Sequence, residues 1–144
     1  MMLKNFDEME QFVLAQPAPR KVALAAAHDA DALGSLLMAV DKGVAEAVLI
    51  GKKDEICALL TDMGRDPDAF TIIDESDDRA MANKAVELVH EGKADMPMKG
   101  LMHTSTFMKA ILDKEIGLRE PDALLSQASI FETVSYTHLT LPTN

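Results

Sequence analysis

The part of this sequence best suited to chemistry is residues 98–106 (MKGLMHTST), which hold a lysine, a glycine, a histidine and three consecutive hydroxyl residues. We expect a strand to end within this run and a helix to begin at Thr104. Hydroxyl donors, free backbone N–H groups and the positive end of the helix dipole together suit an anion. Gly100 would let a ligand approach the backbone closely, and Lys99 and Lys109 add positive charge. An ordinary hydroxyl cap beside a buried histidine is the alternative interpretation.

Three other turns follow predicted strands and carry weaker signals. Residues 28–31 (HDAD) place two carboxylates at a helix start, where capping of the helix by Asp29 is favoured over a His-Asp pair that acts as an acid and base or as a metal ligand. Residues 51–54 (GKKD) match neither glycine-rich phosphate motif and indicate an exposed cap turn. Residues 74–78 (DESDD) indicate a solvated helix start rather than a magnesium site.

Short apolar runs alternate with amphipathic segments along most of the chain. The runs predict strands at residues 21–28, 45–50, 70–74, 94–102 and 124–132, and the amphipathic segments predict helices at residues 2–16, 29–42, 54–63, 77–91 and 104–113. This alternation indicates an α/β fold with a mostly parallel sheet and helices on both faces, a three-layer αβα arrangement. Pro97, inside the fourth predicted strand, indicates a bulge or a strand at the sheet edge.

Composition narrows the possible partners and the compartment. The 144 residues carry 14 basic and 24 acidic side chains, a net charge of −10, which argues against duplex nucleic acid or an anionic membrane as partner. No apolar run approaches the roughly 20 residues of a membrane span. The single cysteine, Cys57, is expected to be buried and fits a reducing compartment, so we expect a cytoplasmic, soluble domain.

Three blocks of sequence resemble a known family. Residues 94–119 (ADMPMKGLMHTSTFMKAILDKEIGLR), 22–40 (VALAAAHDADALGSLLMAV) and 124–132 (LLSQASIFE) resemble the phosphate acetyl/butyryltransferases, and are most similar to the phosphate butyryltransferase branch. The resemblance covers about residues 3–133. It implies an acyltransferase that converts butanoyl-CoA and phosphate into butanoyl phosphate and coenzyme A, with the coenzyme A ester as substrate and no metal or other cofactor.

The resemblance also implies a fold and a set of site residues. The fold is the two-domain α/β fold shared with isocitrate and isopropylmalate dehydrogenases, with the site between the domains, in enzymes that are commonly dimers. Lys109 falls where relatives place an arginine that binds the substrate anion, and Arg119 is a further candidate for phosphate or coenzyme A. The candidate substrate-binding residues are Lys99, Gly100, His103, Thr104, Ser105, Thr106, Lys109 and Arg119.

Family members are longer than this chain, and their catalytic serine and aspartate lie near the natural C-terminus, so no residue here is assigned a catalytic role. We therefore expect residues 1–133 to be an incomplete first domain, inactive alone, with a sheet edge and apolar helix faces left uncovered. Residues 134–144 (VSYTHLTLPTN) contain no charged side chain and resemble a translated sequencing adapter, so we expect a non-native tail.

Two other functions remain open at this point. One is a non-catalytic α/β module that binds a nucleotide or an acyl-CoA, and the other is a phosphate acetyltransferase. A dehydrogenase is disfavoured because no dinucleotide-binding fingerprint follows the first predicted strand.

Overall fold

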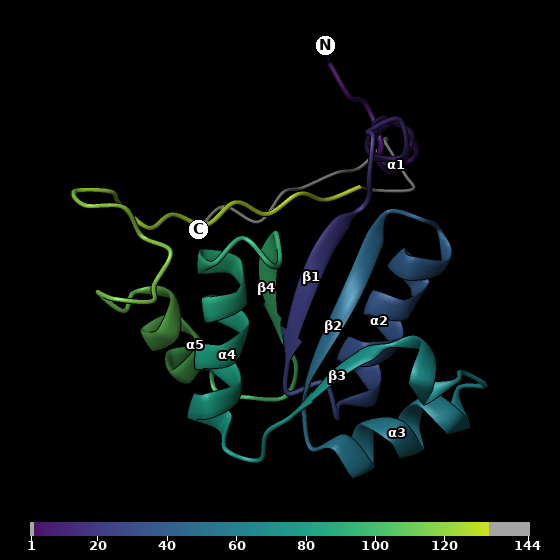
Figure 1. Ribbon diagram of the computed structural model, residues 1–144. Helices are drawn as coiled ribbons and strands as arrows, with labels where there is room; N and C mark the ends of the chain where they lie inside the picture. The colour runs from purple at the N-terminus through teal and green to yellow at the C-terminus, as the bar shows by residue number, and fades with distance from the viewer. Residues whose placement is uncertain (1, 133–144) are drawn as a thin grey trace, which may run out of the picture.

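The computed structural model describes residues 2–132, which form a parallel β-sheet with helices on both of its faces (Figure 1). The sheet order is β3-β2-β1-β4, and every pairing is parallel. The strands are β1 (Arg20–Ala25), β2 (Ala45–Gly51), β3 (Thr71–Asp74) and β4 (Met96–Lys99). The helices are α1 (Phe6–Leu14), α2 (Ala30–Asp41), α3 (Lys53–Asp62), α4 (Asp78–His90) and α5 (Thr104–Ile111), with a 3₁₀ turn, η1, at Pro67–Ala69.

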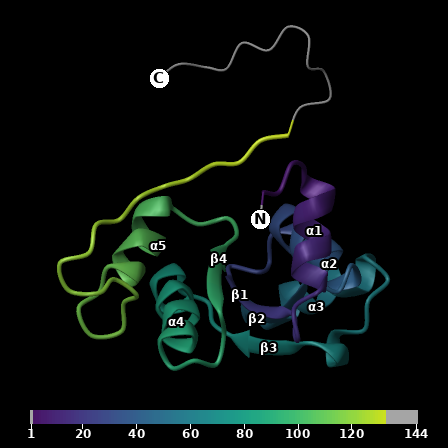
Figure 2. The same cartoon turned by 90° about the horizontal axis from the view of Figure 1, so that it is seen from above.

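The central strand β1 explains why the sheet is covered on both faces. Its side chains alternate between two buried clusters, with Val22 and Leu24 in one and Ala23 and Ala25 in the other. The first cluster includes buried residues of α2 and α3, whereas the second includes those of α4 and α5. Figure 2 shows the two helix pairs on opposite sides of the strands. The predicted three-layer arrangement is therefore confirmed.

The order of the strands creates one reversal in the chain path. From β1 the chain adds β2 and then β3 on one side, and it then returns to place β4 on the other side of β1. In parallel α/β sheets, ligands bind outside the carboxyl ends of the strands at such a reversal. We therefore expect a ligand to bind at the turns that follow β1 and β4. They lie at the opposite end of the sheet from α1 (Figure 1).

The predicted fifth strand is wrong. Residues 123–132 have no ladder partner and cross from the α5 side to the α1 side as irregular chain (Figure 2). An apolar run becomes a strand only where a sheet edge pairs with its backbone and other elements cover its side chains. Here Leu124 is 95% exposed and Phe131 is 78% exposed, so neither condition is met.

In the sheet formed by residues 2–132, Pro97 lies in the edge strand β4, which pairs with β1, as one of the two interpretations predicted. Cys57 is half-buried rather than buried. Among the described residues, helix α1 has no buried residue, and four of its apolar side chains, Phe6, Phe12, Val13 and Leu14, are 36–45% exposed. No helix within residues 2–132 is long and apolar enough to cross a membrane. The proposed non-native segment, residues 134–144, lies outside the described residues.

Candidate functional site

The turns that follow β1 and β4 are in direct contact, and Gly100 makes that contact possible. A Cβ atom at Gly100 would lie 2.3 Å from the Ala26 carbonyl oxygen and 3.3 Å from Asp29 Cβ. The Gly100 N–H donates to the Ala25 carbonyl at 2.7 Å, which extends the β1–β4 ladder to the last residue before the turn. Ala26 is fully buried and has a φ of 58°, a left-handed conformation unusual for alanine. The backbone is therefore tightly constrained where the strand order reverses.

The loop between β4 and α5 is closed by its own polar groups. The partly buried Lys99 donates from Nζ to the Met102 carbonyl at 3.1 Å, and the Met102 N–H donates to the Gly100 carbonyl at 2.9 Å. The Lys99 side chain thus holds the loop in place, and the hydrogen bond keeps the positive charge of Lys99 next to the loop backbone. Leu101, at the tip of the loop, is 81% exposed, so an apolar side chain stands next to these polar groups.

Helix α5 begins without the side-chain cap found on three other helices. Asn5, Asp29 and Asp77 each cap their own helix by accepting a backbone N–H. The N-cap residue of α5 is His103, which is exposed and whose side chain makes no cap hydrogen bond. The interpretation of a hydroxyl cap beside a buried histidine is therefore wrong. The first N–H groups of α5 are not taken by a capping side chain, as an anion-binding helix start requires.

The remaining hydroxyl residues and Lys109 lie along α5. Thr104 and Ser105 are exposed, and Thr106 is half-buried. Ser105 and Lys109 are four residues apart, so they share a helix face one turn from each other. Lys109 is exposed in the last turn. Residues 99–109 thus form a continuous loop and helix that carry hydroxyl and N–H donors and two positive charges.

Arg119 lies apart from this loop. Its side chain lines a hollow of about 330 Å³ that is lined otherwise by Ile111, Leu118, Glu120, Ala123, Leu124 and Leu125. The connection from α5 is a tight turn in which the Asp113 carboxylate accepts the N–H groups of Glu115 and Ile116, at 2.8 and 3.1 Å. These two hydrogen bonds lower the pKa of Asp113 below its usual value. Seven of the eight candidate residues are thus contiguous in the loop and helix α5, whereas Arg119 lines a hollow beyond the end of α5.

The other turns at this edge are tied together by hydrogen bonds. Asp29 caps α2 by accepting the Asp31 N–H at 3.1 Å, which confirms the capping interpretation. The Lys52 N–H donates to Nδ1 of His28 at 3.4 Å, and the Lys53 N–H donates to Oδ1 of Asp74 at 3.1 Å. Within residues 2–132, no group of three or more histidine, cysteine, aspartate or glutamate side chains is placed to hold a metal ion.

The sequence did not predict the hydrogen bond between His28 and Lys52 or the contact of Ala26 with Gly100. The signal available in the sequence was the glycine at the end of a strand, which can mark a close approach of another part of the backbone. A Cβ atom at Gly51 would lie 2.7 Å from Nδ1 of His28, so Gly51 and Gly100 both mark places where a neighbouring turn approaches the backbone.

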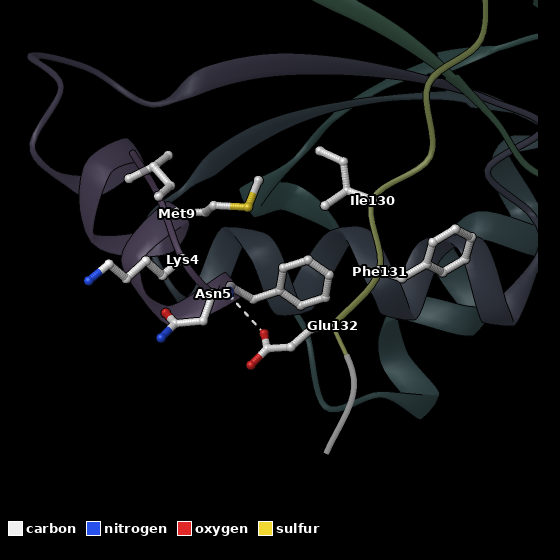
Figure 3. Close-up of a pocket in the computed structure, with 8 residues that line it drawn as sticks. Lys4, Asn5, Met9, Ile130, Phe131 and Glu132 are labelled. Carbon is white, nitrogen blue, oxygen red and sulfur yellow. Dashed lines mark hydrogen bonds between the residues drawn. The ribbon is translucent and has the colours of Figure 1, made fainter. Parts of the chain in front are cut away.

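A second hollow lies at the other end of the sheet, between the start of α1 and residues 130–132 (Figure 3). Its volume is about 290 Å³, and its lining combines apolar side chains, such as Phe6, Met9, Ile130 and Phe131, with the polar residues Lys4, Asn5 and Glu132. The Phe6 N–H donates to Oε2 of Glu132 at 2.8 Å across it. This hollow contains none of the candidate residues.

Comparison with known proteins provides an independent line of evidence. No family model matches the chain. The chain is 41% identical over 138 residues to the phosphate butyryltransferase of Clostridium acetobutylicum, a match to 96% of this chain and 45% of that protein. It is 34% identical over 106 residues to the phosphate acetyltransferase of Thermotoga maritima, a match to 74% of this chain and 36% of that protein.

The chain is a homologue of the phosphate acetyl- and butyryltransferases. Among solved structures, a phosphotransacetylase from Streptococcus pyogenes superimposes with a TM-score of 0.63 at 18% identity, over 78% of this chain and 42% of that chain. That similarity shows a shared fold. The chain spans less than half the length of each of these relatives.

Proposed function

We propose that this chain is part of a phosphate acyltransferase that moves an acyl group between coenzyme A and inorganic phosphate, with butanoyl as the acyl group. The observation that carries the proposal is the 41% identity to a phosphate butyryltransferase across 96% of the chain. In this enzyme, residues 1–133 are part of the first domain of a fold like that of isocitrate and isopropylmalate dehydrogenases. The enzyme is cytoplasmic and forms a homo-oligomer.

The geometry of residues 99–109 supports an anion-binding role. The uncapped start of α5 offers N–H donors to phosphate, and Lys109 supplies a positive charge one turn along the same face as Ser105. The exposed Leu101 beside these donors suits an acyl chain next to the phosphate. Arg119 lines a hollow that includes no residue of the loop. Its positive charge is therefore assigned to a negative group of the substrates other than the phosphate bound at α5. No cofactor is assigned, since the coenzyme A ester is itself the substrate.

Because the chain spans 45% of the C. acetobutylicum protein, we propose that it does not catalyse the reaction by itself. Residues 134–144 are proposed to be a non-native tail. The match to the C. acetobutylicum protein covers 138 residues, more than the 133 that precede this tail, and it therefore includes some tail residues. Re-sequencing the gene across the codon for Thr133 tests whether the tail is non-native.

A chimera tests the function directly. In the C. acetobutylicum phosphate butyryltransferase, the segment aligned with this chain is replaced by this chain's aligned residues, and coenzyme A release from butanoyl-CoA is followed with and without phosphate. We expect phosphate-dependent release from the chimera and none from the 144-residue chain alone. A folded chimera that releases no coenzyme A would contradict the proposal. Tight binding of coenzyme A to the isolated chain would instead favour a binding module.

A further inference from the structure

We propose that Lys99 is a positioning residue of the acyl transfer, which holds the Met102 carbonyl and thereby fixes the direction of the His103 N–H, a backbone donor to the phosphate. This inference rests on the function proposed above, in which phosphate binds at the start of α5. It gives Lys99 a role that is exerted through the loop backbone, beyond the positive charge that it brings to residues 99–109.

The start of α5 has backbone donors that the rest of the described chain leaves free. Among residues 2–132, the N–H groups of His103, Thr104 and Ser105 have no backbone or side-chain acceptor. The next N–H, that of Thr106, already donates to the His103 carbonyl at 3.1 Å. Neighbouring free N–H groups at the positive end of a helix can hold an anion together, because the dipole and the donors act in the same direction.

Lys99 reaches these donors through the Met102 carbonyl. The Lys99 side chain is half-buried at the end of β4, and its Nζ donates to the Met102 oxygen at 3.1 Å. In the described part of the chain Lys99 forms no ion pair, whereas Lys42 and Lys93 each pair with a glutamate. The Met102 carbonyl is therefore the partner of this ammonium, and a hydrogen bond from a charged donor is stronger than one between neutral groups.

The peptide bond between Met102 and His103 connects this carbonyl to the free donor. The bond is trans, so its C=O and its N–H point in opposite directions within one plane. A carbonyl held by Lys99 therefore directs the His103 N–H away from the ammonium. The Met102 side chain is 8% exposed and packs in the buried cluster that includes residues of α4 and α5. The orientation of the peptide is thus set by two contacts, of which Lys99 makes the polar one.

Without the Lys99 hydrogen bond, the Met102–His103 peptide could rotate about its two flanking bonds. A rotated peptide would present a carbonyl oxygen where the N–H had been, and the partial negative charge of that oxygen would repel phosphate. Lys99 therefore keeps the donor oriented before phosphate binds, so that no reorganisation is needed during the reaction.

Kinetics of the chimera measure the consequence for phosphate. Lys99→Met removes the donor and keeps an aliphatic side chain, whereas Lys99→Arg keeps a charged donor. We expect Lys99→Met to lower kcat/KM for phosphate about 10- to 100-fold, as for loss of one charge-assisted hydrogen bond, with the KM for butanoyl-CoA changed only a few-fold. Lys99→Arg should recover most of the lost kcat/KM.

The matched control is Lys93→Met, which makes the same substitution just before β4 and removes an exposed ion pair with Glu91. It changes the net charge of the chain as Lys99→Met does, but it leaves the loop contacts intact. We therefore expect Lys93→Met to leave kcat/KM for phosphate unchanged.

A spectroscopic measurement reports on the peptide itself. Met102–His103 is the only methionine–histidine step in the 144-residue sequence, so carbonyl-¹³C methionine and ¹⁵N histidine labels give a single signal in an HNCO spectrum. In this chain, Lys99→Met should move the Met102 carbonyl ¹³C resonance upfield, because that carbonyl loses a hydrogen bond. Lys99→Arg should restore the resonance, and Lys93→Met should leave it in place.

The two readouts together distinguish positioning from other roles. A lower kcat/KM with an unmoved peptide signal would show that Lys99 acts through its charge alone, and this would overturn the proposal. A moved signal with unchanged kinetics would show a structural role alone, and a Lys99→Arg variant that restores neither readout would also count against positioning. These results leave the proposed function intact, whereas an inactive unsubstituted chimera would overturn both.

Discussion

Replacing Gly100 by alanine should destabilise the fold at the junction of β1 and β4. The new Cβ would lie 2.3 Å from the Ala26 oxygen and 3.2 Å from the Ala26 carbonyl carbon, whereas ordinary contacts begin at 3.4 Å. The two backbones would have to separate by about 1 Å. Neither can yield easily, because the Gly100 N–H bonds to the Ala25 carbonyl at 2.7 Å and Ala26 is fully buried.

Overpacking of this kind costs about 1–3 kcal/mol, a fall of about 5- to 150-fold in the ratio of folded to unfolded chain. Urea unfolding followed by circular dichroism should therefore show a lower midpoint for Gly100→Ala. The matched control is Gly34→Ala in α2, where a Cβ would have no neighbour within 4 Å. That variant should gain roughly 0.5–1 kcal/mol, because alanine favours a helix more than glycine does. A Gly100→Ala variant as stable as the original chain would refute the close contact.

Three further predictions test other parts of the structure. In the chimera, Lys109→Ala should raise the KM for phosphate while Lys114→Ala, at another exposed lysine, should not; an unchanged KM for Lys109→Ala would count against the anion role. Because hydrogen bonds lower the pKa of Asp113 in the folded chain, its contribution to stability is present above the unfolded pKa and is lost as pH falls through the folded pKa. As the pH is lowered from the unfolded pKa of Asp113 through its folded pKa, the urea midpoint should therefore fall more for the original chain than for Asp113→Ala. Equal falls in the two midpoints would contradict this prediction. Ala85→Leu should lower the free energy of unfolding by about 1–3 kcal/mol, because Ala85 is fully buried in the cluster that joins α4 to β1, and an unchanged urea midpoint would show that the site has free space.

The sequence predicted the regular elements well where local pattern and packing agree. The run at β1 alternates between two buried clusters, and Asp29 caps α2 as its position before the helix suggested. The fifth strand was predicted wrongly because the same apolar pattern needs a pairing edge, and local sequence does not say whether one is available. Cys57 was predicted as buried from its helix face but is half-buried.

The site could be predicted only in part. The loop and helix start at residues 99–109 follow from local sequence, since they are contiguous in the chain. The contacts of Gly100 with Ala26 and of His28 with Lys52 join turns far apart in sequence, and they depend on the order of the strands in the sheet. Arg119 follows the turn at Asp113 and lines a hollow that Ile111 of α5 also lines, and local sequence does not predict this hollow.

The central claim is that this chain supplies the phosphate-binding loop of an enzyme that forms an acyl phosphate. Its most direct test is ³¹P NMR of the chimera incubated with butanoyl-CoA and inorganic phosphate. The account predicts the growth of a butanoyl phosphate signal matched by the loss of inorganic phosphate. A folded chimera that leaves the phosphate signal unchanged, under conditions in which the C. acetobutylicum enzyme forms product, would contradict it.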